Sequence, residues 1–134
     1  MSPLADNANS NTFSSGELLD RSEKSLEIIK YSSDITNSLV SIPKFKNTEL
    51  NKEVIRMKFY LSEYIGAVKR YNHLARLDSY TRYRNSYKKI QKLRETLQPE
   101  ERDVINRFMV KIKTNMSMLE ALKIDADTTK TINQ

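Results

Sequence analysis

Residues 69–94 carry a high density of side chains that bind anions. Nine of the residues from 69 to 94 are basic and only Asp78 is acidic. Six tyrosines lie between residues 60 and 87. Lysine and arginine neutralise phosphates, and tyrosine rings stack on unpaired bases with about 1–3 kcal/mol each. The same charges attract an acidic partner subunit. The candidate binding residues are Lys69, Arg70, Arg76, Tyr80, Arg82, Arg84, Lys88, Lys89, Lys92 and Arg94.

A structural role accounts for part of the same pattern. Tyr64, Tyr71, Tyr83 and Tyr87 fall at helical spacings that would bury them against other helices, whereas Tyr80 lies off that spacing. A row of lysines and arginines is also the ordinary composition of a solvated helix face. The basic segment is therefore either a binding surface for nucleic acid or an acidic partner, or a solvated face.

Groups that could support catalysis are sparse. His73 is the single histidine, and the nearest acidic residue in sequence is Asp78. The chain has no cysteine and no glycine-rich phosphate loop. Asp125 and Asp127 resemble the start of a calcium loop but lack its glycine and its distant glutamate. We expect no enzyme activity, no cofactor or metal, and no small-molecule substrate.

Length and charge indicate one small domain. The chain has 134 residues and a formal net charge of +6, and the excess lies in residues 49–97, with twelve basic against five acidic residues. No apolar stretch approaches the roughly 20 residues that span a bilayer, and residues 1–15 lack the apolar segment of a secretory signal. We expect a cytoplasmic protein, or a nuclear one in a eukaryote, without a membrane partner.

The elements that position these residues are long helices. Helical spacing of apolar residues predicts helices at about 15–41, 48–97 and 99–123, within a helical domain spanning 15–124. Pro43 ends the first helix, and Pro99 with Glu100 begins the last. Polar residues 1–14 predict a disordered segment and residues 125–134 a flexible tail. The sequence predicts an all-α protein, forming an elongated helical bundle or a coiled-coil-like assembly.

The region from residue 48 to residue 97 has the clearest periodicity. Apolar residues alternate spacings of four and three along a predicted packing seam: Leu50, Val54, Met57, Leu61, Tyr64, Val68, Tyr71 and Ala75. Asp78 interrupts this pattern, and a shifted one resumes at Tyr83, Tyr87 and Ile90. The region is therefore one long helix, or two helices with a bend near residues 76–80. Stripes of this length predict self-association or a protein partner, giving a homo- or hetero-oligomer.

Residues 79–90 read SYTRYRNSYKKI and residues 97–102 read LQPEER, before another apolar helical pattern. This arrangement resembles the helical A domain of GINS subunits. The matching positions are Tyr80, Arg82, Arg84, Lys89, Ile90, Leu97, Pro99, Glu100 and Glu101. The resemblance implies a non-catalytic scaffold subunit, an accessory factor of the DNA replication helicase. The alternative is a small basic helical protein that binds nucleic acid through residues 69–94.

Overall fold

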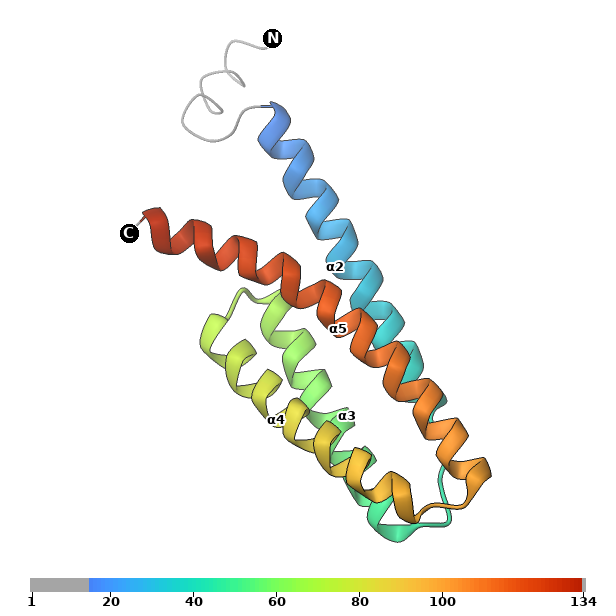
Figure 1. The fold of residues 1–134 in the computed structure, drawn as a ribbon. Coiled ribbons are helices and arrows are strands. Elements are labelled where there is room, and N and C mark those ends of the chain that lie inside the picture. Colours follow the sequence, from blue (N-terminus) through green and yellow to red (C-terminus); the bar gives the residue numbers. More distant parts are fainter. Residues whose placement is uncertain (1–14, 134) are drawn as a thin grey trace.

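The computed structural model describes the backbone of residues 15–133 and the side chains of residues 22–122. The described chain is all-α, as predicted, and contains no strand. Its elements are α2 (Ser15–Ser41), α3 (Thr48–Lys69), α4 (His73–Leu93), the short 3-10 helix η1 (Arg94–Thr96) and α5 (Pro99–Asn133) (Figure 1). The predicted disordered segment, residues 1–14, lies outside the described residues.

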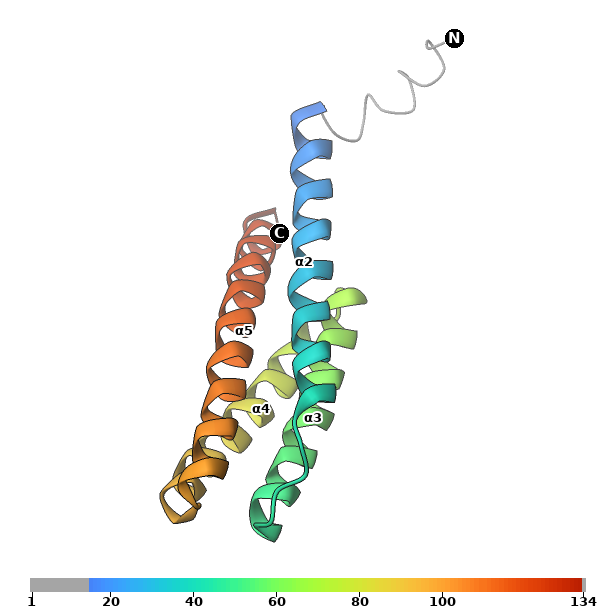
Figure 2. The same ribbon diagram turned by 90° about the vertical axis from the view of Figure 1, so that its right-hand side faces the viewer.

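The four long helices run alternately up and down (Figures 1 and 2). Backbones approach most closely between α3 and α4 and between α2 and α5. The two helices of each pair are antiparallel, and the N-terminal end of α2 extends beyond the other helices (Figure 2). α5 continues to Asn133, so the backbone is helical where we expected a flexible tail from residue 125. The result is an elongated four-helix bundle.

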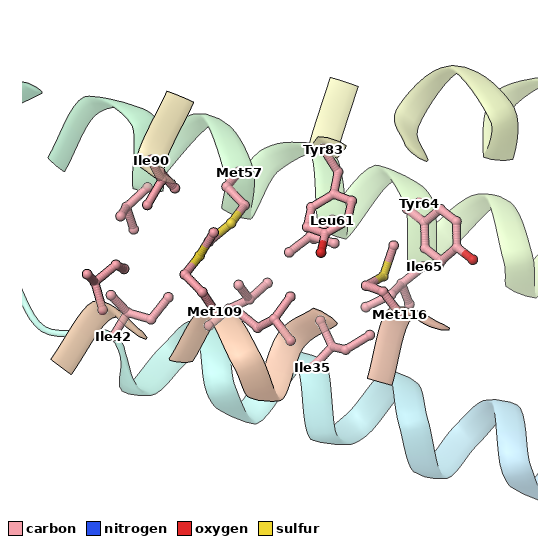
Figure 3. Packing of buried hydrophobic residues seen from close by; sticks show 14 of the residues in the cluster. Ile35, Ile42, Met57, Leu61, Tyr64, Ile65, Tyr83, Ile90, Met109 and Met116 are labelled. Atoms are coloured by element: carbon pink, nitrogen blue, oxygen red, sulfur yellow. The ribbon is translucent and has the colours of Figure 1, made fainter. Parts of the chain in front are cut away.

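Most of the predicted seam on α3 lies in the core. Leu50, Val54, Met57, Leu61, Tyr64 and Val68 are all buried, because spacings of four and three keep them on one side of the helix. They meet buried side chains of the other helices, among them Ile35 of α2, Tyr83 of α4 and Met109 of α5 (Figure 3). A single hydrophobic core therefore joins all four helices.

The last two seam predictions, Tyr71 and Ala75, are wrong because the helix ends before them. α3 stops at Lys69 and α4 begins at His73, so the chain reverses at residues 70–72 rather than bending near 76–80. Tyr71 has a φ of 55° and is 60% exposed, and Ala75 is only partly buried. The amides of Asn72 and Tyr71 donate to the carbonyls of Ala67 and Val68 at 2.9 and 3.1 Å. This is a Schellman C-cap with tyrosine at the position that glycine usually takes.

The buried face of α4 combines two serines and an arginine with two large core residues. Its buried positions are Arg76, Ser79, Tyr83, Ser86 and Ile90, at spacings of three and four. Tyr87, expected on this seam, is only partly buried, and Ser86 takes the inward position. A small side chain at Ser79 and Ser86 allows the two backbones to approach, and the Ser79 hydroxyl is satisfied by donating to the Ala75 carbonyl at 2.7 Å.

The connection between α2 and α3 closes one end of the bundle. Phe45 is buried there, and the Asn51 side chain binds its backbone twice, accepting from the amide at 2.8 Å and donating to the carbonyl at 2.7 Å. Asn47 caps α3 by accepting from the Leu50 amide at 2.9 Å. The Lys46 amide donates to Glu101 of α5 at 2.6 Å. These bonds fix the ends of α3 and α5 relative to each other.

Candidate functional site

One predicted anion-binding residue, Arg76, is part of the interior. Its Nη1 donates to both carboxylate oxygens of Glu120 on α5, at 2.8 and 2.7 Å. The two side chains are only 3% and 13% exposed. The prediction that Arg76 contributes to a binding surface is therefore wrong. Its first-turn position on α4 faces α5, where a buried carboxylate stabilises its charge.

Two neighbouring groups extend this buried pair. The Tyr64 hydroxyl donates to Glu120, and His73 Nδ1 lies 3.2 Å from Arg76 Nη2. Burial raises the pKa of Tyr64, and the hydrogen bond to the Glu120 carboxylate raises it further. Tyr64 therefore remains a protonated donor. Through this contact with Arg76, His73 joins the same network.

Three further basic residues of the segment have partners within the bundle. Arg82 Nε donates to Asp78 at 3.0 Å, and this contact raises the pKa of Arg82. Lys89 Nζ lies 3.9 Å from Glu53, a buried carboxylate of α3. Arg94 Nη1 donates to Asn106 at 2.9 Å. Asp78 and Glu53 thus partly compensate the charges of Arg82 and Lys89, whereas neutral Asn106 only accepts a hydrogen bond from Arg94.

The basic residues that remain on α4 lie on its opposite flank. Arg84, Lys88 and Lys92 are exposed and follow one another at intervals of four residues, a rise of about 6 Å each. Lys113 of α5 is exposed across from them. Among the side chains of residues 22–122, none of these four forms an ion pair with an acidic group. Lys69 and Arg70 lie apart, at the turn that joins α3 to α4.

A groove of about 240 Å³ separates the two helices at this flank. We call it the α4–α5 groove, and its walls contain three cations and no acid. Its lining residues are Tyr80, Tyr83, Arg84, Tyr87, Lys88, Gln91, Lys113, Met116 and Ser117.

Three tyrosines, Tyr80, Tyr83 and Tyr87, line the α4–α5 groove. The centroids of Tyr80 and Tyr83 are 6.0 Å apart, as are those of Tyr83 and Tyr87. Arg84 lies over Tyr80 at 5.9 Å and Lys113 over Tyr87 at 5.7 Å. Tyr83 is buried, and burial is the main cause of its raised pKa. The aromatic rings therefore hold two of the cations in place through cation–π contacts.

The structure thus brings only some of the predicted binding residues together at the groove. Tyr80, Arg84 and Lys88 line the α4–α5 groove and Lys92 continues their row, whereas Arg76 is buried. Lys113 was missed, together with Gln91, Met116 and Ser117 of the same groove. Lys113 is one basic residue in a helix with balanced charge, and only the packing of α5 beside α4 brings it to the site.

Neither a metal-binding cluster nor a membrane-spanning helix occurs in the part of the chain that the structure describes. Among the described residues, no cluster of three histidine or acidic side chains is placed to hold a metal ion. None of the described helices has the length and apolar character required to cross a bilayer.

The described chain is therefore an all-α bundle with a surface groove lined by tyrosines and cations. Comparison with protein-family models, curated proteins and solved structures finds no match to this chain. Membership of the GINS family therefore stays a prediction that rests on residues 79–102.

Proposed function

We propose that this protein is a non-catalytic interaction subunit that binds an acidic segment of a protein partner in the α4–α5 groove. The observation that carries this proposal is the composition of the groove. Arg84, Lys88 and Lys113 line it without an acidic neighbour, beside half-buried Tyr80 and Tyr87. Tyrosine and arginine are, with tryptophan, the residues enriched among those that dominate the binding energy of protein interfaces.

The size of the groove favours a segment of a polymer over a free small molecule. Its volume of about 240 Å³ lies below the roughly 300–1,000 Å³ of typical small-molecule pockets. An acidic segment would place one or two side chains in the groove and continue along the row formed by Arg84, Lys88 and Lys92. Carboxylates would then accept charge-assisted hydrogen bonds from the cations.

Two observations favour protein over nucleic acid. Four uncompensated cations are fewer than the six to ten phosphate contacts of strongly salt-dependent DNA binders. In addition, Arg84 and Lys113 already lie over the rings of Tyr80 and Tyr87, which occupies ring faces that bases would need for stacking. Single-stranded nucleic acid is the second candidate, favoured by the straight row of cations on α4.

The predicted GINS-like role specifies one setting for this function. In that setting the acidic segment would belong to a sister subunit of a replication assembly, and the bundle would act as a scaffold. The proposal of a groove for an acidic segment does not depend on that setting, because it rests on the residues of α4 and α5 alone.

A titration with two labelled probes tests the proposal. Fluorescence anisotropy compares a glutamate-rich peptide of about ten residues with an oligothymidylate of similar length. We expect the peptide to bind, and the triple variant Arg84→Glu, Lys88→Glu, Lys113→Glu to bind it at least about tenfold more weakly.

The matched control carries the same change of net charge elsewhere: Lys44→Glu, Lys52→Glu and Lys111→Glu, all at exposed positions. We expect it to retain peptide affinity within about threefold, since remote surface charges act mainly through screened fields. Equal weakening by both triple variants would contradict a specific groove. Tighter binding of the oligonucleotide, lost in the groove variant alone, would favour the second candidate.

A further inference from the structure

The outer face of α3 carries an apolar ridge that the bundle does not cover. Ile55 is 66% exposed and Phe59 is 59% exposed, although large apolar side chains on the other face of the same helix are buried. Ser62 and Gly66 continue the ridge at spacings of three and four residues. This repeat gives α3 a second stripe for packing against a helix, opposite the core seam.

A hollow of about 220 Å³ lies beside Phe59, between α3 and α4. The Phe59 and Tyr60 rings meet edge to face at 5.8 Å on one side of it. Two guanidinium groups also line it. Arg82 is held by Asp78 at 3.0 Å, and an Arg70 nitrogen lies 3.0 Å from where a Cβ of Gly66 would be. Arginine favours the face of an aromatic ring, so the hollow suits a phenyl group.

The charges beside the ridge specify which molecule fits it. Arg56 comes three residues before Phe59, and Glu63 comes four residues after it. If a second α3 lies antiparallel with the two Phe59 residues at the centre, each Arg56 faces the Glu63 of the other copy. A parallel arrangement would instead place like charges together.

The charges and the ring positions together favour a second copy of this chain as the molecule that covers the ridge. We propose that two copies of this chain form a twofold-symmetric dimer through antiparallel α3 helices, with the Phe59 ring of each copy in the hollow of the other. Such an isologous contact requires a self-complementary surface. The hollow meets this condition, because its two arginines are balanced by Glu63 and Asp78. It differs in this respect from the uniformly basic α4–α5 groove, which lies on the other flank of α4.

The existing contacts leave this pairing available. Arg56 Nη1 donates to Glu53 at 2.7 Å, but a guanidinium has five donors and can bind a second carboxylate. Among the described side chains, Glu63 forms no ion pair. A second copy would therefore provide each exposed charge with an opposite one while covering Ile55 and Phe59.

Sedimentation equilibrium with a charge-swap set tests the dimer. We expect the wild-type chain to dimerise and Phe59→Glu to be monomeric, because it places a charge at the centre of the interface. Arg56→Glu and Glu63→Arg should each weaken the dimer at least about tenfold, since each alters two symmetry-related contacts. Their combination restores opposite charges and should return the dissociation constant to within about threefold of wild type.

Circular dichroism of the same variants shows whether each remains folded. Phe59 and Glu63 are exposed, so we expect their variants to keep the helical spectrum of wild type. Arg56→Glu also removes a partner of buried Glu53, so we expect it to remain helical but to melt at a lower temperature. A wild-type chain that stays monomeric at about 100 μM would overturn the proposal. So would a folded Phe59→Glu variant that still dimerises, or a double reversal weaker than both single ones.

Discussion

The buried pair of Arg76 and Glu120 gives the sharpest test of the structure. Arg76→Met keeps a long side chain but removes the guanidinium, which donates to both Glu120 oxygens at 2.8 and 2.7 Å. Breaking a buried pair by removing one partner costs about 3–5 kcal/mol. In the Arg76→Met variant Glu120 keeps its hydrogen bond from the Tyr64 hydroxyl, and its side chain is 13% exposed. We therefore expect the free energy of unfolding to fall by about 3 kcal/mol, the lower end of this range.

A double-mutant cycle separates this interaction from a loss of packing. Glu120→Gln removes the negative charge and preserves an acceptor for Tyr64, so the combined Arg76→Met, Glu120→Gln variant leaves no unpaired buried charge. It should be at least about 2 kcal/mol more stable than the sum of the single effects implies. The free energy of unfolding is measured by urea denaturation followed by far-ultraviolet circular dichroism.

The control for this cycle is Arg84→Met, which changes an exposed arginine on the same helix and should cost no more than about 0.5 kcal/mol. If Arg76→Met were equally mild, or if the two single effects were additive, Arg76 would be a surface residue and the placement of α4 against α5 would be wrong.

Three further predictions concern the core, the alkaline range and one glycine. Leu61→Ala should lower the free energy of unfolding by about 2–5 kcal/mol, since Leu61 is fully buried; exposed Lys52→Ala should cost under about 0.5 kcal/mol, and similar melting temperatures would refute the assigned helix face. Burial and a carboxylate raise the pKa of Tyr64 above its ordinary value of 10.0. The stability that the protonated Tyr64 hydroxyl gives the folded chain is therefore fully present below about pH 10. Above that pH it should fall by about 1.4 kcal/mol per unit. Denaturation at several alkaline pH values should therefore show a shallower decline for Tyr64→Phe, and an unchanged slope would contradict the raised pKa. Gly66→Ala should stabilise the chain by about 0.5–1 kcal/mol in thermal unfolding, because a helical glycine is unfavourable and the crowding atom belongs to the flexible end of Arg70; destabilisation would show that Arg70 is held rigidly.

Helical periodicity predicted the class of fold and most of the core of α3. The same periodicity missed the reversal at residues 70–72, because Tyr71 takes a left-handed conformation without the glycine that usually marks it. Tyr71 and Ala75 continued the apolar spacing by coincidence of residue type, while the cap supplied by Asn72 to the Ala75 amide at 3.0 Å gave only a weak local signal.

The candidate site was only partly predictable for a related reason. Charge alone marked residues 69–94, but it could not show that Arg76 turns inward or that Lys89 meets an acid. Those outcomes depend on Glu120 and Glu53, which are distant in sequence. Lys113 likewise joins the α4–α5 groove only through tertiary packing, which a single sequence does not specify.

We propose that the α4–α5 groove, rather than the whole basic segment, binds the partner. Affinity purification from the native cell, with quantitative mass spectrometry, compares wild type with the two triple variants. We expect at least one protein with an acidic segment to be recovered with wild type and with Lys44→Glu, Lys52→Glu, Lys111→Glu. The same protein should be lost with Arg84→Glu, Lys88→Glu, Lys113→Glu. Recovery of the same proteins with all three chains would contradict this proposal.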